Sequence, residues 1–205
     1  MNKRSGAATR ERILDAAHAV FSSQGYNQAS MRAIARAAGM SVGGLYIHFQ
    51  DKEALHHTLM SRCLEDLTRK RHEALAQTAD PVAALRGFIT VTLAHARENR
   101  AMILLQGREL GVSFGSELKK SFSRESRQRL AGLICQGISA GAFRQVDAEE
   151  AGRVIFSALR GFVLSLVIDE EALFSAEECA DLLLHGLRDS ENTKIPFYIP
   201  ASGHL

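Results

Sequence analysis

The sequence has little of what would place it in a disulfide-bonded or membrane-spanning class. It contains three cysteines, three prolines and no tryptophan. Cys63, Cys135 and Cys179 are odd in number and lack paired spacing, so no disulfide framework is expected and a reducing cytoplasm is the default location. The most apolar run, Val154–Ile168, is interrupted by Arg160 and is shorter than the roughly 20 apolar residues that span a bilayer. A soluble cytoplasmic protein is therefore expected, with no membrane partner.

The small net charge hides an uneven distribution. The formal net charge is +2 at pH 7. Residues 1–52 hold seven basic and three acidic side chains, or +4, which leaves −2 for the remainder. Residues 1–8 form a basic arm with no apolar stretch behind it, so they do not predict a signal peptide. A positive N-terminal end is what phosphate binding requires.

Strand-like alternation is also missing, and apolar residues recur instead at the spacing of one helix face. Helix start and stop signals then divide the second part of the chain. The expected helices are a long linking helix from Asp51, one opened by Asp80-Pro81, a short one at 101–110, a long one at 116–141, and a closing pair capped by Asp147 and by the Ser175–Glu178 capping box. A loop is expected at 111–115.

Three short amphipathic helices are predicted at the N-terminal end. Thr9 is the expected N-cap of the first helix and Gly25 its stop. Ser30 caps the second helix, which ends at Gly39, and Ser41 caps the third. A helix, a turn of about three or four residues with a glycine, and a second short helix have the spacing of a DNA-binding helix-turn-helix.

Two glycines open the predicted third helix. Gly43 and Gly44 each cost roughly 1 kcal/mol relative to alanine in a helix, so helix propensity does not explain them. The missing side chains would let the backbone approach phosphates and base edges. The alternative is a glycine-weakened turn between two core helices.

These N-terminal residues resemble the DNA-binding domain of the TetR family of bacterial transcriptional repressors. The similarity runs without a gap through Ile13-Leu14-x-Ala16-Ala17, Phe21, Gly25-Tyr26, Ser30, Ile34-Ala35-x-x-Ala38-Gly39, Ser41-x-Gly43-x-Leu45-Tyr46-x-His48-Phe49 and Lys52-Glu53-x-Leu55. The resemblance implies a homodimer on operator DNA. It also implies a C-terminal domain that dimerises and binds a small molecule.

The resemblance implies DNA contacts residue by residue. The DNA-binding set comprises Ser30, Met31, Arg32, Ser41, Val42, Gly43, Gly44, Tyr46, Ile47, His48 and Lys52. Within it, Ser30, Tyr46, His48 and Lys52 would hold phosphates; Val42, Gly43, Gly44 and Ile47 would face bases or thymine methyl groups. Val42 and Gly44 stand where many relatives carry polar or basic side chains, so the base preference cannot be read from the sequence.

The two closing helices resemble the dimerisation helices of the family. Their apolar stripes are wide enough to bury against their own domain and against a second molecule. The residues expected at the dimer interface are Ile155, Leu159, Phe162, Leu166, Leu183 and Leu187. The alternative is that both helices belong only to the intramolecular core.

A small apolar effector is expected in the C-terminal domain. Polar residues on otherwise apolar stripes mark where the pocket is expected. The expected contacts on these helix faces are Phe88, Thr92, His95, Met102, Gln106, Phe122 and Ser126. The alternative is a set of satisfied polar core residues.

A looser similarity, in Gln106–Leu110 and in Gly137-x-x-x-Gly141-x-Phe143-Arg144, is to members that respond to long-chain acyl-CoA. Phosphates of such a ligand would pair with Arg108, Lys119, Lys120, Arg124, Arg127 and Arg129. A solvated basic face explains the same charges, and a drug-like or other apolar effector stays open.

An enzyme is not expected. The run Gly137–Gly141 fits the G-x-S-x-G pattern of hydrolases, but that pattern works where a strand turns sharply into a helix, and here it ends a helical segment. The histidines have neither HExxH spacing nor a Cys/His zinc set, so neither metal nor cofactor is expected.

These patterns predict an all-α protein: residues 1–52 form a three-helix helix-turn-helix domain, residues 53–188 an effector-binding and dimerisation domain, and residues 189–205 a flexible tail. The predicted function is a ligand-responsive repressor that binds a palindromic operator as a homodimer. The alternative is a ligand-independent helix-turn-helix activator or architectural DNA-binding protein.

Overall fold

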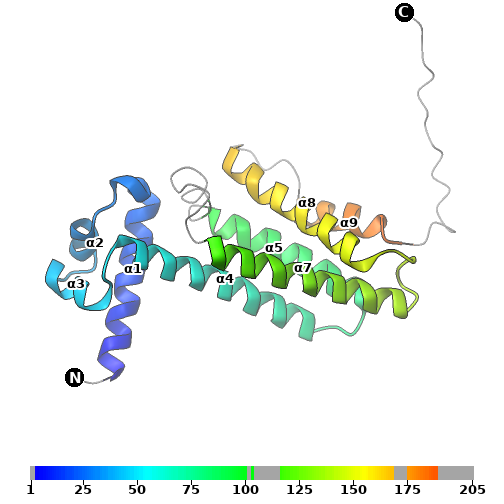
Figure 1. The fold of residues 1–205 in the computed structure, drawn as a ribbon, viewed down its shortest axis with the longest axis horizontal. Coiled ribbons are helices and arrows are strands. Elements are labelled where there is room, and N and C mark those ends of the chain that lie inside the picture. The colour runs from blue at the N-terminus through cyan, green and yellow to red at the C-terminus, as the bar shows by residue number, and fades with distance from the viewer. Residues whose placement is uncertain (1–2, 101–102, 104–115, 169–174, 189–205) are drawn as a thin grey trace, which may run out of the picture.

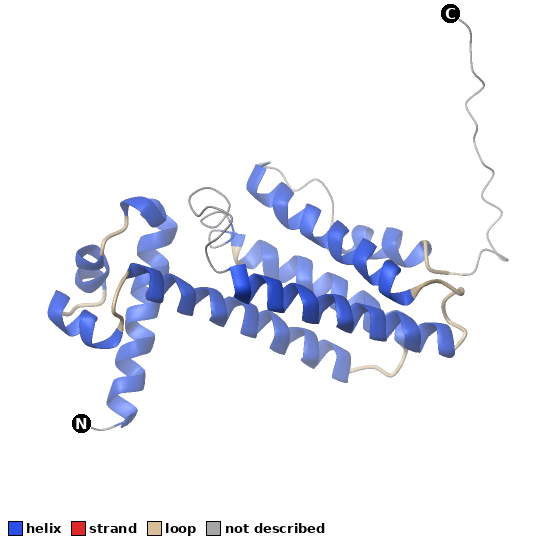
Figure 2. Ribbon diagram, viewed as in Figure 1, coloured by secondary structure: helices blue, strands red, loops and turns tan. Residues whose placement is uncertain are grey.

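The computed structural model describes residues 3–100, 103, 116–168 and 175–188. Every regular element in these ranges is a helix (Figure 2), which confirms the all-α prediction. The short helix predicted at 101–110, the loop at 111–115 and the tail at 189–205 lie outside the described residues. Among the described helices, none combines the length and apolar character needed to cross a membrane.

The N-terminal domain consists of α1 (Lys3–Gln28), α2 (Met31–Ala37) and α3 (Val42–His48) (Figure 1). Helix α1 begins before Thr9, so the predicted N-cap at Thr9 is wrong; Ala7 and Ala8 are good helix formers and extend the helix towards the N-terminus. The predicted stop at Gly25 is confirmed by a kink with φ 78°, a left-handed conformation that glycine adopts without strain.

Side-chain caps fix the ends of the short helices where the sequence predicted them. The Ser30 hydroxyl accepts a hydrogen bond from the Ala33 backbone N–H at 3.1 Å. The Ser41 hydroxyl accepts one from the Gly44 N–H at 3.1 Å. Between them Gly39 has φ 65° and turns the chain from α2 into α3. The predicted helix-turn-helix geometry is therefore present.

In the second part of the molecule, the described residues form five helices (Figure 1). They are α4 (Lys52–Ala76), α5 (Pro81–Glu98), α7 (Ser116–Ser139), α8 (Ala148–Ile168) and α9 (Ala176–His185). Helix α5 packs against α4, α7, α8 and α9, and α7 also packs along α8. The predicted caps at Asp51, Asp80 and Asp147 and the capping box of Ser175 and Glu178 are all formed.

The two hydrophobic cores meet inside α4. Leu55, Leu59 and Met60 are buried in the N-terminal core, whereas the C-terminal core begins at Leu75 along the chain. The N-terminal core therefore extends beyond the predicted domain boundary at residue 52. Leu118, near the start of α7, also packs against the N-terminal core. Two helices of the second part thus contact the helix-turn-helix domain.

Candidate DNA-binding face and effector cavity

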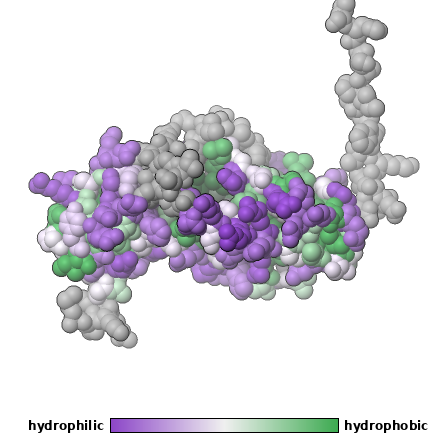
Figure 3. All heavy atoms as spheres, viewed as in Figure 1, coloured by the Kyte–Doolittle hydropathy of each residue, from purple (hydrophilic) through white to green (hydrophobic). Residues whose placement is uncertain are grey.

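Helix α3 turns one face into the core and the other into solvent. Leu45 is fully buried, while Tyr46 is 51% and Ile47 76% exposed. Val42, in the first turn, is 36% exposed. Figure 3 shows a hydrophobic patch on the outer side of the N-terminal domain, over α3. Large apolar side chains held outward on a capped helix are suited to contact with thymine methyl groups in a major groove.

Arg10 of α1 holds the C-terminal end of α3, a role that the sequence analysis missed. Its Nη1 donates to the His48 carbonyl at 3.1 Å, and its guanidinium lies 4.1 Å from the centroid of the Phe49 ring. Arg10 was counted only as part of the basic N-terminal end, because no local spacing relates it to His48, 38 residues later.

Lys52 lies at the surface next to the helix-turn-helix, but its ammonium group has backbone partners. Lys52 Nζ donates to the carbonyls of Tyr26 (2.6 Å) and Ala29 (3.0 Å) and lies 4.2 Å from the Tyr26 ring centroid. These bonds connect the start of α4 to the turn between α1 and α2. The geometry gives Lys52 a structural role that competes with the phosphate contact predicted from sequence.

Other residues of the predicted DNA-binding set differ in their exposure. Arg32 is exposed and Met31 is half-buried against the N-terminal core. A Cβ atom added at Gly43 would meet nothing within 4 Å, whereas one added at Gly44 would lie 3.2 Å from the Ser41 hydroxyl oxygen. The cap at Ser41 therefore explains Gly44, and only Gly43 leaves open space towards solvent.

Four residues predicted to bind an effector gather around Arg71 of α4. Arg71 Nε donates to Thr92 Oγ1 at 2.9 Å, and Nη1 donates to Ser126 Oγ at 3.0 Å. The guanidinium lies 4.1 Å from the ring centroid of Phe88 and 5.2 Å from that of Phe122. All of these except Thr92 line a cavity of about 380 Å³.

Arg71 itself was not among the predicted contacts. A usable signal was present, because Arg71 stands four residues after buried Leu67 and so continues the inward face of α4. Burial lowers the pKa of Arg71 to about 10, while nearby Glu125 opposes that shift. The guanidinium therefore stays charged at neutral pH.

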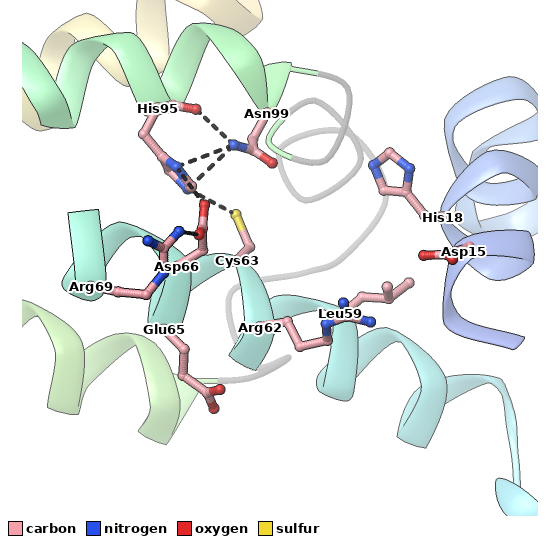
Figure 4. Close-up of a pocket in the computed structure, with 10 residues that line it drawn as sticks. All are labelled: Asp15, His18, Leu59, Arg62, Cys63, Glu65, Asp66, Arg69, His95 and Asn99. Atoms are coloured by element: carbon pink, nitrogen blue, oxygen red, sulfur yellow. Dashed lines mark hydrogen bonds and ion pairs between the residues drawn. The ribbon is translucent and has the colours of Figure 1, made fainter. Parts of the chain in front are cut away.

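His95, also predicted as an effector contact, lies at a different cavity. Its Nε2 is 3.4 Å from Cys63 Sγ, and its Nδ1 is 3.5 Å from a carboxylate oxygen of Asp66. Figure 4 shows these side chains with Asn99 on one side of a cavity of about 490 Å³, facing α1. The predicted effector set is therefore divided between two places, and its members Met102 and Gln106 lie outside the described residues.

The residues predicted at the dimer interface differ in their burial. Four of the six side chains are buried in the chain's own core: Ile155, Leu159, Phe162 and Leu187. Leu183 is half-buried against the same core, and the side chain of Leu166 lies outside the described set. Among the described side chains of these helices, the large apolar ones that are exposed are Val154, Leu164 and Leu182, at 57%, 55% and 77%. The chain therefore buries four of the predicted interface residues within itself and leaves other apolar side chains of the same helices exposed.

The basic residues proposed for acyl-CoA phosphates are scattered. Lys119 is half-buried, and burial lowers its pKa; Lys120 pairs with Glu117 at 2.8 Å. Arg129 lines the Arg71 cavity and lies 3.4 Å from His72 Nδ1. Arg124 and Arg127 are exposed, and Arg108 lies outside the described residues. Only Arg129 therefore adds charge to the cavity.

The hydrolase-like run has a structural explanation. It ends helix α7, and Gly141, with φ 70°, turns the chain after it. A Cβ atom at Gly137 would lie 2.0 Å from the Phe143 ring, so glycine is required for that packing. Within the described ranges, no group of three or more His, Cys, Asp or Glu side chains could hold a metal ion.

Comparison with known proteins agrees with this geometry. Residues 13–59 match the family model for bacterial regulatory proteins, tetR family. The chain is 28% identical over 150 residues to the HTH-type transcriptional repressor KstR2 of Rhodococcus jostii (strain RHA1), which covers 71% of this chain and 74% of that protein. It is 42% identical over 77 residues to the HTH-type transcriptional regulator UidR of Escherichia coli (strain K12), covering 38% of this chain and 36% of that one.

The likeness to solved structures extends over the second domain. The TetR family transcriptional regulator PfmR from Thermus thermophilus superposes with a TM-score of 0.69 at 30% sequence identity, covering 87% of this chain and 100% of that chain. These relatives are transcriptional regulators rather than enzymes. The chain therefore belongs to the TetR family and is a DNA-binding transcriptional regulator.

Proposed function

We propose that the protein is a repressor that binds a near-palindromic operator as a homodimer and is released by a small apolar effector. The observation that carries the proposal is the path from the Arg71 cavity to the helix-turn-helix domain. Helix α4 holds Met60 in the N-terminal core and Arg71 at the cavity, about 16 Å further along the helix. A ligand that moves this part of α4 moves the DNA-reading domain with it.

A second connection supports the same mechanism. Helix α7 places Leu118 against the N-terminal core. Phe122 and Ser126, which line the cavity, follow on the same helix, and Ser126 lies about 12 Å along the helix axis from Leu118. The hydrogen bond from Arg71 to Ser126 joins α4 to α7 across the cavity. A ligand that inserts between these helices changes their separation, and both reach the N-terminal domain.

DNA binding is assigned to the exposed side of α3 with the residues around it. Tyr46, Ile47 and Val42 project from this helix, and Gly43 lets the backbone approach closely. One seven-residue helix reads too few base pairs to specify a site, which favours two copies on a two-fold operator. The similarity to the repressor KstR2 supports repression as the outcome of binding.

We place the dimer interface on the outer faces of α8 and α9. Val154, Ala158, Gly161 and Leu164 are exposed at helical spacing along α8, and Leu182 is exposed on α9. The small residues in the centre of this row allow a second helix to approach closely. A second copy of the chain would cover the exposed valine and leucines.

Selection of bound duplexes from a random library tests DNA binding. The expected result is a near-palindrome with half-site centres about one helical turn, or a multiple of it, apart. The same duplex, labelled for fluorescence anisotropy, then reports release by a panel of acyl-CoAs and hydrophobic drugs.

The cavity is tested by filling it. Ser126→Phe should block release by any active compound, and Ser121→Phe on the exposed side of the same helix is the matched control. Reciprocity requires operator DNA to weaken effector binding by the same factor. Release that survives Ser126→Phe would place the effector elsewhere, and a panel with no active member would favour a ligand-independent regulator.

A further inference from the structure

The cavity between α4, α5 and α7 contains a charge whose partners are all neutral. Arg71 is only 6% exposed. Its two hydrogen-bond partners are the Thr92 and Ser126 hydroxyls, and within the described residues no carboxylate lies within 4.0 Å of it. Glu125 lines the same cavity, where its charge favours the protonated guanidinium without forming an ion pair.

A buried cation of this kind is costly unless an anion compensates it. Removing a guanidinium from water is unfavourable, and hydroxyl dipoles offset that loss less well than a carboxylate or phosphate does. An arginine also carries five N–H donors, more than two hydroxyls can use. Arg71 therefore retains donors, in an electrostatic setting that favours an incoming negative group.

The surroundings of Arg71 hold the guanidinium in place for such a group. The rings of Phe88 and Phe122 lie near it, and the Thr92 hydroxyl accepts from Nε while donating to the Phe88 carbonyl. The Ser126 hydroxyl accepts from Nη1 and has no acceptor for its own proton in the described part of the chain. A ligand oxygen could take that proton as a second hydrogen bond.

From these observations we infer that the effector is an apolar molecule with one oxyanion, a carboxylate or a phosphate, which pairs with Arg71 while its apolar part packs against Phe88 and Phe122. This inference rests on the proposed function, because it names the chemical class of ligand at the same cavity. Arg129, a second cation in the cavity lining, adds to the attraction. The cavity of about 380 Å³ lies within the range of small-molecule sites.

Matched probes on the full chain test the role of the anion. Decanoate, decyl phosphate and decanol share an apolar chain and differ in the head group, and decanoyl-CoA presents its phosphates at the end of a long carrier. Binding is measured by calorimetry and by the shift in melting temperature. The wild-type protein should bind at least one of the oxyanion probes at least tenfold more tightly than decanol, and the preferred probe identifies the head group.

Two variants separate recognition by Arg71 from a purely structural role. Arg71→Met keeps the length of the side chain without its charge, and should lose at least tenfold in affinity for the preferred anion while binding decanol as well as or better than wild type. Arg71→Lys keeps the charge and should recover part of the affinity for the anion. A structural role would instead lower the affinity of all probes alike, along with the melting temperature of the free protein.

The outcomes distinguish this inference from the proposed function. If decanol binds as tightly as the charged probes, and Ser126→Phe abolishes its binding, the cavity binds the effector but the inferred oxyanion is not required. If Arg71→Met binds the charged probes as tightly as wild type does, the inferred pairing with Arg71 is overturned, while the proposal that the cavity binds the effector is retained. If no probe binds and none of the compounds in the broader panel releases the protein from DNA, both proposals fail.

Discussion

Helix α3 and the Arg71 cavity place their unusual side chains in opposite ways. On α3 the exceptions are exposed apolar groups: Val42, Tyr46 and Ile47 face solvent on a helix anchored by buried Leu45. At the cavity the exceptions are buried polar groups, with Arg71, Thr92 and Ser126 close to the rings of Phe88 and Phe122. The proposed function accounts for both placements by a ligand, DNA at α3 and a small molecule at the cavity.

This contrast also predicts which substitutions should change binding alone and which should change both binding and stability. An exposed residue on α3 can be changed with little effect on folding, so its effect should be seen in DNA binding alone. A residue at the Arg71 cavity is packed on several sides, so its effects on stability and on ligand binding must be measured together.

The largest expected effect is on α3. Ile47→Glu adds a negative charge where phosphates and base edges would lie, and should weaken operator binding about 100-fold or more, equivalent to about 3 kcal/mol. Because Ile47 is 76% exposed, the melting temperature of the free protein should stay unchanged. Fluorescence anisotropy with the selected operator measures the first quantity and calorimetry the second.

Exposed Gln24 on α1 provides the control for that substitution. Gln24→Glu adds the same charge to another helix of the domain, and should cost far less affinity. Equal losses from the two variants would mean that α3 has no special role in reading DNA.

A second large effect is expected at the outer faces of α8 and α9. Val154→Glu or Leu182→Glu should shift the protein from dimer to monomer and weaken operator binding by about 2 kcal/mol or more, because the two helix-turn-helix domains are then no longer joined. Sedimentation at several concentrations follows the change. A dimer that tolerates both substitutions would exclude this face as the interface.

The N-terminal domain should lose stability in mild acid because of His56. Its ring is buried against Phe21 and Tyr26, and burial, with smaller contributions from Lys119 and His57, lowers its pKa from 6.5 to about 4. The unfolded chain therefore binds a proton at a higher pH than the folded chain does. The stabilisation is complete above pH 6.5 and declines as the pH falls towards 4, by about 2 kcal/mol at pH 5.

Two measurements check the assignment to His56. The pH dependence of unfolding free energy between pH 8 and pH 5 should be smaller in His56→Leu than in wild type. The imidazole titration followed by NMR should have a midpoint well below 6. A midpoint near 6.5 would contradict the predicted effect of burial.

The smallest expected effect distinguishes two explanations of Gly43. Alanine is preferred over glycine in a helix by about 1 kcal/mol, and the site has open space for its methyl group, so Gly43→Ala should stabilise the free protein by about that amount. If the glycine serves close approach to DNA, the same variant should bind the operator less tightly. A variant that is more stable and binds DNA equally well would leave Gly43 without a role in recognition.

Sequence was most informative where the deciding interactions are local. The caps at Ser30, Ser41 and Asp51 bind backbone groups three residues away, so their signals lie within a single turn of helix. The start of α1 was missed because Thr9, a good capping residue, also fits inside a helix when alanines precede it.

The Arg71 cavity and the exposed face of α8 depend on contacts between residues that are far apart in the sequence. The hydrogen bond between Arg71 and Ser126 joins residues 55 apart, and no spacing rule connects them. On α8 an apolar stripe identifies residues that must be buried, but it does not say whether they bury against the same chain or another. Ile155 and Leu159 lie inside and Val154 outside because of how α8 packs on α5 and α7, which only the assembled fold determines.

Because Leu118 packs against the N-terminal core, two helices of the bundle, α4 and α7, contact the DNA-reading domain. A connection through α4 alone would constrain the orientation of that domain less. Because α4 and α7 both contact the N-terminal core, a ligand that separates them, as the proposed function requires, would move one contact relative to the other and so reorient the domain that carries α3.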